Sequence, residues 1–363
     1  MELTSALKKY TSEQLSAVSA QRLAQEIAFA PVVFQVSRLM IKFGIFSRLC
    51  EQTDGMTLEE IATQTSLSKY AVQVLLEASL SIGTVIVKEG KFYITKAGWF
   101  LEKDKMTRVN LEFTHEVCYQ GLYHLEEALR EEKPIGLQVF GNWATIYEGL
   151  SQLPAVTQEK WFAFDHHYSD ISFPDALRIV FAKPIKKLLD VGGNTGRWAL
   201  QCVTYNTEVE VTIMDLPQQL ELMREAIKGK FGAERIHGHG ANLLDNSVPF
   251  PTGFDVIWMS QFLDCFSQEE VISILSRVAQ SMDEKTELYI LEAYWDRQSH
   301  ETGAYCLTQI SVYFTAMANG NSKMYYSQDM IYCVEKAGLK VAQIYDNVGR
   351  GNSHTIFRCV KSE

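Results

Sequence analysis

The stretch Lys187–Gly196, Lys-Leu-Leu-Asp-Val-Gly-Gly-Asn-Thr-Gly, constrains the fold more than any other part of the chain. Leu188 and Leu189 predict a buried parallel strand, and Asp190 ends the apolar run. The glycines that follow predict a tight turn that leads into a helix. Such a turn presents free backbone N–H groups at a helix N-terminus. We therefore expect a ligand-binding turn after the first strand of an α/β sheet.

The spacing of the glycines narrows the choice of ligand. A dinucleotide fingerprint reads Gly-x-Gly-x-x-Gly. Here Gly192, Gly193 and Gly196 place the last glycine one position early, and Asn194 stands in the middle slot. A compact turn of this kind suits a cofactor without a phosphate, such as S-adenosylmethionine (SAM). The next strand ends in Asp215, whose carboxylate can accept both hydroxyls of an adenosine ribose. The alternative is a tight structural turn without a ligand.

Strands and helices alternate from residue 187 onward, which predicts a doubly wound, parallel, Rossmann-like α/β sheet. The expected strands are 187–191, 209–214, 235–237, 254–259, 286–292, 341–345 and 354–360. The expected helices are 196–205, 217–230, 268–282 and 327–337. Because 363 residues exceed a typical single domain, we divide the chain into three regions. They are a mainly helical dimerisation domain (1–105), a helical linker and substrate-pocket region (106–183) and a SAM-binding domain (184–363).

The N-terminal region predicts an interaction between subunits. An amphipathic helix over 12–30 is followed from Pro31 by a second helix that is apolar on nearly all faces. We expect these helices to form a homodimer interface, and the alternative is burial within their own domain. Residues 57–98 have the helix–turn–helix and hairpin pattern of a winged helix. Its second helix offers only Lys69 as a cation, so a structural role is favoured over DNA binding.

Composition excludes several classes of function. The formal net charge of −10 disfavours nucleic acid as a partner. The seven cysteines are scattered and form no Cys-x-x-Cys pair, which favours a reducing, cytoplasmic compartment and no metal site. The chain also has no signal-peptide pattern, and no apolar run reaches the roughly 18 residues of a membrane span.

Five segments, the glycine turn among them, occur in a characteristic order: Leu189–Gly196, Met214–Pro217, Gly240–Asp245, Met259–Phe266 and Leu288–Glu292. This series resembles the successive motifs of class I SAM-dependent O-methyltransferases. The group in question includes plant caffeate and isoflavone, acetylserotonin and bacterial polyketide O-methyltransferases. The resemblance covers nearly the whole chain, because the winged helix and the helices before it match the dimerisation region of that group. It implies that Gly192–Gly196 binds SAM.

The resemblance also implies a role for individual residues around the cofactor. Gly192 and Gly193, after Asp190, would approach the methionyl group, Asp215 would hold the ribose and Leu216 would pack on the adenine. Where the family has Gly-Asp-Phe-Phe, this chain has Ala241–Leu244, so Asn242 would accept from the adenine amine beside Leu243. The other residues expected around the cofactor are Ser260 and Gln261.

The largest departure from the family lies at the catalytic base. The family reads Leu-His-Asp-Trp after the fourth strand, and this chain reads Leu263-Asp264-Cys265-Phe266. An aspartate with a pKa of about 3.9 is a weak base toward a phenol with a pKa of about 10. Burial, or a proton shared with Glu292, would strengthen it. Two alternatives remain open: the acceptor is already acidic and needs only orientation, or Asp264 is a structural carboxylate.

An aromatic stretch over 161–169 supplies further candidates. His167, with its neighbour His166, is a second possible source of the missing imidazole. An apolar set could form the pocket for a small-molecule methyl acceptor: Trp161, Phe162, Tyr168, Phe314, Met317 and Met324, with Tyr313 as a further member. Tyr168 falls near a position where the family carries a Met.

The expected function is SAM-dependent O-methylation of a small aromatic or polyene hydroxyl. An alternative follows from the missing histidine, because the group that the chain resembles includes SAM-binding members with decarboxylase or hydroxylase chemistry. A ligand-sensing DNA-binding protein and an NAD oxidoreductase are disfavoured by the weakly basic helix and the short glycine turn.

Overall fold

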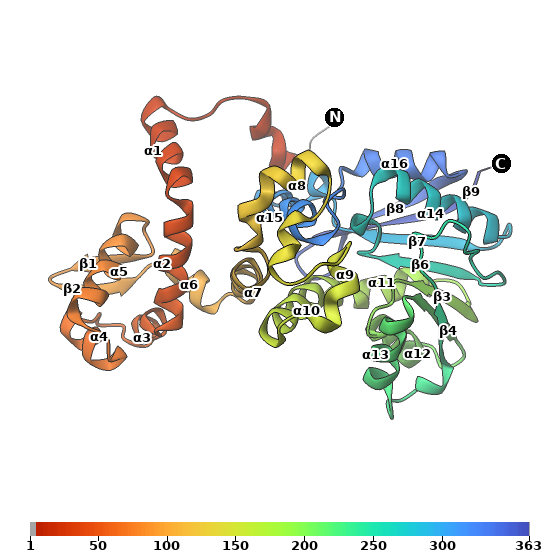
Figure 1. Cartoon of the computed structure of the whole chain (residues 1–363), viewed down its shortest axis with the longest axis horizontal. Coiled ribbons are helices and arrows are strands. Elements are labelled where there is room, and N and C mark those ends of the chain that lie inside the picture. Colours follow the sequence, from red (N-terminus) through yellow and green to blue (C-terminus); the bar gives the residue numbers. More distant parts are fainter. Residues whose placement is uncertain (1–4, 363) are drawn as a thin grey trace. The chain divides into compact units, whose positions relative to one another are not determined.

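The computed structural model describes residues 5–362. The chain divides into two compact units, one of Glu13–Glu116 and one that combines the described part of residues 1–12 with the chain from Val117 onward. Each unit is described by itself below, and Figure 1 gives the element labels.

The Glu13–Glu116 unit is mainly helical. Its elements are α1 (Ala17–Ala28), α2 (Ala30–Lys42), α3 (Ile45–Glu51), α4 (Leu58–Thr65), α5 (Lys69–Ser81), β1 (Val85–Lys88), β2 (Lys91–Ile94), α6 (Lys96–Lys103) and α7 (Lys105–Phe113). Thr57 and Glu60 form a capping box at the start of α4. Ser68 caps α5, and β1 and β2 pair antiparallel. The core lies between α2, α3, α4 and α5.

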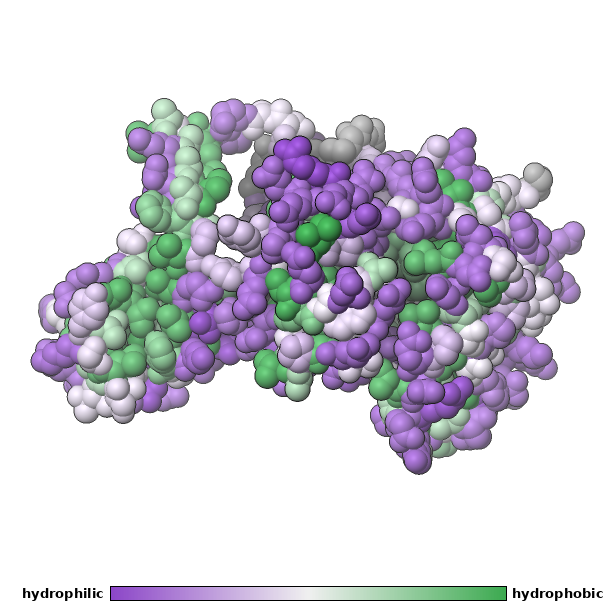
Figure 2. All heavy atoms as spheres, in the orientation of Figure 1, coloured by the Kyte–Doolittle hydropathy of each residue, from purple (hydrophilic) through white to green (hydrophobic). Residues whose placement is uncertain are grey.

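The first helix of this unit has no buried residue. Its apolar side chains and those just beyond it are exposed, namely Leu15, Val18, Leu23, Ile27, Phe29 and Val32. Figure 2 shows hydrophobic residues gathered along α1 and α2. A monomeric soluble protein rarely exposes so continuous an apolar surface.

The larger unit opens with η1 (Ser5–Thr11) and then a set of helical segments from residue 121 to residue 180. These are η3 (Gly121–His124), α8 (Leu125–Glu131), η4 (Ile135–Val139), α9 (Ile146–Gly149), η5 (Leu150–Gln152), α10 (Ala155–Asp170) and α11 (Phe173–Val180), while η2 (Thr114–Cys118) joins them to α7. Four of them, α9, η5, α10 and α11, carry side chains of the cavity described below.

A seven-stranded sheet follows, with strand order β5-β4-β3-β6-β7-β9-β8. The strands are β3 (Lys187–Val191), β4 (Glu210–Asp215), β5 (Ile236–Gly240), β6 (Val256–Ser260), β7 (Glu287–Glu292), β8 (Leu339–Val348) and β9 (His354–Lys361). Every expected strand is therefore present. Pairs within β5-β4-β3-β6-β7 are parallel, as expected.

The expectation of a wholly parallel sheet is wrong for the last two strands. β9 pairs antiparallel with both β7 and β8. The physical reason is the connection: only residues 349–353 join β8 to β9, and a parallel pair needs a crossover of a dozen or more residues.

Helices cover both faces of the sheet (Figure 1). The helices are α12 (Arg197–Tyr205), α13 (Pro217–Ile227), α14 (Gln268–Ser281), α15 (Glu301–Tyr313) and α16 (Ser327–Lys336), with short segments η6 (Ala233–Arg235), η7 (Leu263–Cys265), η8 (Trp295–Arg297) and η9 (Phe314–Ala318). α14 and α16 pack on one face, and α11, α12 and α13 pack on the other. The sequence did not lead us to expect α15. The carboxyl ends of β3, β4 and β6 meet where the strand order reverses, which is where open α/β sheets bind ligands.

Among the described residues, no single helix is long and apolar enough to span a membrane, although the bent pair α2 and α3 passes the test together by length and composition. All seven cysteines are free thiols. The described part of the chain holds no group of three metal-ligating side chains.

Candidate active site

The glycine turn after β3 has the shape of a cradle for a ligand. Gly192 has a left-handed φ of +72°, which a side chain would strain. A Cβ at Gly193 would lie 2.7 Å from Asp190 Oδ2 and 2.8 Å from Ile213 Cγ2. A Cβ at Gly192 would strike the Phe262 ring. Both positions therefore require glycine, and the turn exposes its backbone to whatever lies above it.

Two carboxylates stand beside this turn. Asp215, at the end of β4, accepts from the backbone N–H of Asn194 at 2.9 Å and from that of Leu216 at 2.7 Å. Its pKa is raised by burial, although these two hydrogen bonds oppose the shift. Asp190 is only 2% exposed, and burial together with the charge of Asp215 raises its pKa to about 8. Asp190 Oδ2 is buried without a hydrogen-bond partner.

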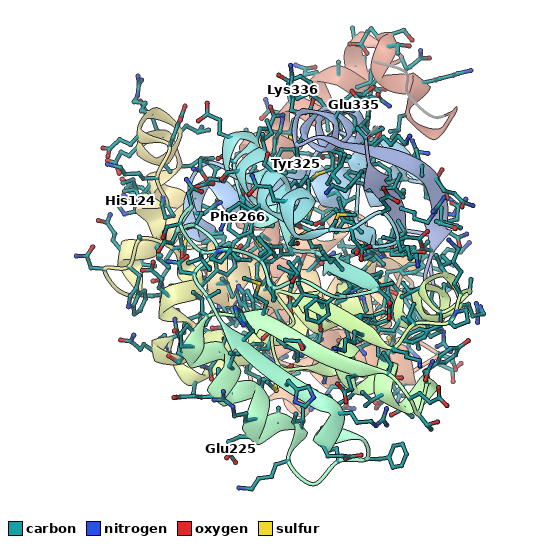
Figure 3. All side chains as sticks on the ribbon, turned by 90° about the vertical axis from the view of Figure 1, so that its right-hand side faces the viewer. His124, Glu225, Phe266, Tyr325, Glu335 and Lys336 are labelled. Atoms are coloured by element: carbon teal, nitrogen blue, oxygen red, sulfur yellow. The ribbon has the colours of Figure 1, made fainter. Side chains whose placement is uncertain are left out.

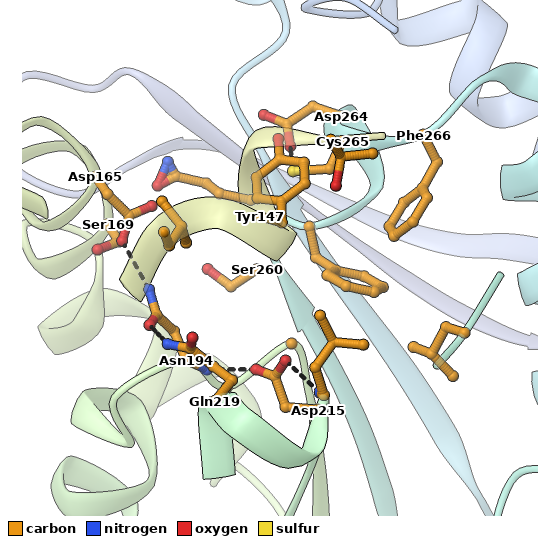
Figure 4. Close-up of a pocket in the computed structure, with 18 of the residues that line it drawn as sticks. Tyr147, Asp165, Ser169, Asn194, Asp215, Gln219, Ser260, Asp264, Cys265 and Phe266 are labelled. Carbon is orange, nitrogen blue, oxygen red and sulfur yellow. Dashed lines mark hydrogen bonds between the residues drawn. The ribbon is translucent and has the colours of Figure 1, made fainter. Parts of the chain in front are cut away.

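Asn194 connects the turn to two neighbouring helices. It adopts a left-handed φ of +51°, which is uncommon outside glycine. Its side-chain Nδ2 donates to Asp165 Oδ2 on α10 at 3.2 Å, and its Oδ1 accepts from Gln219 Nε2 on α13. Figure 4 shows these hydrogen bonds together with those of Asp215.

The residues expected around an adenosine lie at the same edge of the sheet. Asn242 Oδ1 accepts from the backbone N–H of Leu244 at 3.0 Å, which fixes its side chain. Gln261 has a left-handed φ of +46° directly after β6. Ser260 Oγ and Gln261 Oε1 are buried without hydrogen-bond partners. Unpartnered polar atoms beside a glycine cradle fit a polar ligand such as SAM, and strained backbone of this kind clusters at binding sites.

One cavity of about 620 Å³ joins these features. All nine residues expected to contact the cofactor line it: Asp190, Gly192, Gly193, Asp215, Leu216, Asn242, Leu243, Ser260 and Gln261. We call the part lined by Asp190, Gly192, Gly193, Asn194 and Asp215 the glycine end. The part lined by Tyr147, Trp161, Asp264, Cys265 and Tyr313 is called the aromatic end. A cavity of this volume is in the range of small-molecule sites.

The aromatic end contains Asp264, which lies in the η7 turn after β6. Glu292, at the end of β7, holds this turn because its Oε1 accepts from the backbone N–H of Phe262 at 3.0 Å and of Leu263 at 2.9 Å. Asn319 Nδ2 donates to the Cys265 carbonyl at 2.5 Å. The Tyr325 hydroxyl donates to the carbonyl of Phe266 at 2.5 Å, and Figure 3 labels both residues. The turn is therefore fixed from three sides.

Asp264 belongs to a short chain of hydrogen bonds. The Tyr147 hydroxyl donates to the thiol sulfur of Cys265, and Cys265 Sγ donates to Asp264 Oδ1 at 3.5 Å (Figure 4). Burial raises the pKa of the Cys265 thiol well above its usual range, so the thiol stays protonated. Burial also raises the pKa of Asp264 to about 6, although the Cys265 hydrogen bond opposes the shift. The carboxylate is thus a stronger base than an exposed aspartate.

Glu292 supports this turn from outside the cavity. It is 2% exposed and is not among the residues that line the cavity. Burial, followed by the charge of Asp264, raises its pKa well above the usual range. Glu292 therefore supports the turn and does not face the cavity.

The structure divides the other expected residues into two groups. Trp161, Tyr168, Phe314 and Met324 line the cavity, and Trp161 Nε1 donates to the Tyr313 hydroxyl at 2.8 Å. Phe162 and Met317 are outside the lining, and Met317 instead fills the space above Gly121. His166 lines the cavity, whereas His167 does not. Burial lowers the pKa of His166, and its Nε2 has no hydrogen-bond partner.

Sequence reasoning missed several polar residues of the cavity as site residues, among them Tyr147, Asp165 and Cys265. Cys265 stands beside Asp264 in the quoted motif, so its position was a usable signal. Asp165 lies within the aromatic stretch 161–169, where a single carboxylate among rings was the signal. Tyr147 has no motif around it, and only the tertiary structure brings it to Cys265.

Two family models match the chain. A Dimerisation2-like domain matches residues 21–92, and an O-methyltransferase domain matches residues 105–339. Solved structures with the same fold include the apo form of the SAM-dependent methyltransferase SibL, at 22% identity and a TM-score of 0.71 over 93% of this chain and 98% of that one. Human N-acetylserotonin methyltransferase in complex with SAM has 18% identity and a TM-score of 0.65 over 97% and 100% of the two chains.

Curated relatives agree with the family models. L-tyrosine C(3)-methyltransferase of Streptomyces lavendulae is 23% identical over 86% of this chain and 85% of the relative. Demethylspheroidene O-methyltransferase of Rhodobacter capsulatus is 24% identical over 77% of this chain and 68% of the relative. The O-methyltransferase model covers more than half of the sequence, and its residues include the cavity described above. The chain therefore belongs to the O-methyltransferase family, and it is a SAM-dependent methyltransferase.

Proposed function

We propose that the protein methylates the hydroxyl of a small aromatic or polyene acceptor, with Asp264 as the general base. One observation carries the proposal: a buried carboxylate stands at the aromatic end of the cavity whose glycine end fits SAM. Aromatic side chains surround it, and such walls suit a planar, apolar acceptor.

The chemistry of the aromatic end follows from its contacts. An acceptor hydroxyl beside Asp264 would give up its proton to the carboxylate as the oxygen attacks the methyl group. SAM supplies that methyl group as an electrophile and leaves as S-adenosylhomocysteine (SAH). Orientation of the oxygen in line with the methyl group provides much of the acceleration. The thiol of Cys265 and the hydroxyl of Tyr147 orient the carboxylate.

Glu292 has a positioning role in this proposal. A proton shared between Glu292 and Asp264 would need a hydrogen bond between the two carboxyl groups. Glu292 Oε1 instead accepts from the backbone of the turn, and its Oε2 has no hydrogen-bond partner. We propose that His166, rather than His167, is the imidazole available to an acceptor, because only His166 lines the cavity.

The test is a transfer assay with methyl-labelled SAM and a panel of phenols and polyene alcohols. We expect label in an ether product with loss of the acceptor hydroxyl. Decarboxylation or hydroxylation of an acceptor while SAM keeps its labelled methyl group would favour the decarboxylase or hydroxylase alternative, and label only in amines would contradict the proposal.

A second candidate is transfer to a ring carbon beside a phenol hydroxyl. The name of the Streptomyces relative, a tyrosine C(3)-methyltransferase, together with a carboxylate where the family carries a histidine, favours it. Asp264 would remove the phenol proton, the adjacent ring carbon would bond to the methyl group, and the ring proton would then leave to restore the aromatic ring. Ring-deuterated phenols separate the two candidates, because a C-methyl product loses one ring deuterium and an O-methyl product keeps them all.

We further propose a homodimer through α1 and α2 in the cytoplasm, without nucleic acid or membrane as a partner. The exposed apolar surface of α1 and the Dimerisation2-like match support the dimer, and seven free thiols suit a reducing compartment. Sedimentation should show a dimer at micromolar concentration. The double variant Val18→Asp, Ile27→Asp should be monomeric, because it places charges on that surface, and a wild-type monomer would contradict the proposal.

A further inference from the structure

Asp165 stands at the glycine end of the cavity without a role in the function proposed above. It lies on α10, and its Oδ2 accepts from Asn194 Nδ2, directly after the Gly192–Gly193 pair. Its side chain is 30% exposed and lines the cavity. Figure 4 shows Asp165 on the side of Asn194 that is away from Asp215. The residue therefore stands next to the turn where the methionyl group is expected.

No basic side chain is hydrogen-bonded to this carboxylate in the described part of the chain. The nearest imidazole nitrogen, His166 Nε2, is 4.0 Å from Asp165 Oδ2, and burial keeps His166 neutral by lowering its pKa. The guanidinium of Arg197 is bonded to Asp170 instead. A carboxylate that is placed in a cavity without a paired cation suits a cationic ligand group.

The adenosine and amino-acid parts of SAM make different demands on the cavity. Asp215 and the residues after β5 and β6 suit the adenosine, and the open backbone of Gly192 and Gly193 suits the chain of the methionyl group. That chain ends in an α-ammonium and an α-carboxylate. We propose that Asp165 binds the α-ammonium of SAM and thereby selects ligands that carry the amino-acid end. The proposal rests on the use of SAM and not on the identity of the methyl acceptor.

Proton release on ligand binding provides an independent test of the contact between Asp165 and the α-ammonium. Burial, then the charges of Asp264 and Asp170, raise the pKa of Asp165 to about 7, while the Asn194 hydrogen bond and the charge of Arg197 oppose the shift. Part of the Asp165 population is therefore protonated near neutral pH in the free protein. An ammonium beside the carboxylate favours the ionised form, so binding should release a proton below about pH 7. Affinity for SAH should fall as the pH is lowered.

The experiment compares two ligands by calorimetry. SAH carries the amino-acid end, whereas 5′-methylthioadenosine keeps the adenosine and the sulfur but lacks it. In Asp165→Asn, SAH affinity should fall by about 10- to 100-fold, as for a hydrogen bond to a charged group, and methylthioadenosine affinity should stay within about twofold. The matched control is Glu159→Gln, which makes the same change of charge on α10 at a side chain that is 68% exposed. It should alter neither affinity.

Each other outcome has a definite meaning. An equal loss for both ligands would assign Asp165 to support of the turn through Asn194 and would overturn the proposal, as would no loss at all. Retained methylthioadenosine binding shows that the variant is folded. In wild type at pH 6.5, SAH binding measured in two buffers of different ionisation enthalpy should show proton release that is reduced in Asp165→Asn. A wild-type protein that binds neither ligand would instead contradict the cofactor assignment.

Discussion

The glycine end of the cavity is built mostly from backbone and from one short stretch after β3, whereas the aromatic end is built from side chains of distant segments. At the glycine end, Gly192, Gly193 and Asn194 are consecutive, and Asp215 follows on the neighbouring strand. At the aromatic end, Tyr147 comes from α9, Asp264 from the turn after β6 and Tyr313 from α15. The comparison indicates that cofactor binding depends on local geometry, and acceptor chemistry depends on how the segments pack.

The largest expected effect tests the aromatic end. Asp264→Asn keeps the size of the side chain but removes the base, so turnover should fall by about 10²- to 10⁴-fold. SAH affinity should remain nearly the same, because the glycine end is untouched. Steady-state kinetics and calorimetry measure the two quantities. Unchanged turnover would assign Asp264 a structural role. The aromatic end would then no longer be the part of the cavity that supplies the base.

The converse variant tests the glycine end. Gly193→Val should lower SAH affinity by about 10- to 100-fold, because its Cβ would lie 2.7 Å from Asp190 Oδ2 and overpack the turn. Gly240→Ala is the control, since its Cβ would meet its nearest neighbour, Pro217 Cγ, at an ordinary 3.5 Å. Calorimetry with SAH measures both. If the two variants bind equally well, the turn is not the cradle that we describe.

The pH profile should sharpen the assignment of the base. Asp264 must be ionised to accept a proton, and its pKa is raised to about 6. At saturating SAM, the value of kcat/KM for the acceptor should therefore rise about tenfold per pH unit below about 6 and level off above it. Removal of the thiol donor in Cys265→Ala takes away a hydrogen bond that lowers this pKa, so the acid limb should move to higher pH. An unmoved limb would exclude Asp264 as the titrating group.

The smallest expected effect distinguishes two roles of Glu292: sharing a proton with Asp264, or supporting the η7 turn through hydrogen bonds. Glu292→Gln retains an oxygen that accepts from the Phe262 and Leu263 N–H groups, so turnover should change little. Glu292→Ala leaves those buried donors unpaired and should cost about 1–3 kcal/mol of unfolding free energy. Thermal unfolding and kinetics measure the pair. A large loss of turnover in Glu292→Gln would restore the model of a carboxylate pair.

The contrast between local and distant segments also explains which features could be predicted from the sequence. The strands followed from periodicity. Glycine spacing and ordered motifs pointed to the residues expected at the cofactor, and these residues line one cavity. All of these signals act within short stretches. The antiparallel β9 was missed because apolar runs do not encode strand direction, and the short connection to β8 decides it. The choice of His166 over His167 could not be predicted, because neighbouring residues on one helix differ in facing by about 100° and the packing of α10 sets which one meets the cavity.

Asn194 has a consequence for how the cofactor is recognised. Its backbone N–H donates to Asp215, and its side chain is hydrogen-bonded to Asp165 and Gln219. A single residue therefore connects the proposed ribose contact with the proposed ammonium contact. A ligand that binds at either Asp215 or Asp165 also orders the Asn194 side chain, and this ordering favours binding at the other carboxylate. Adenosine and methionine, added as separate fragments, should therefore bind cooperatively, each raising the affinity for the other, and the intact cofactor should gain more than the sum of its halves.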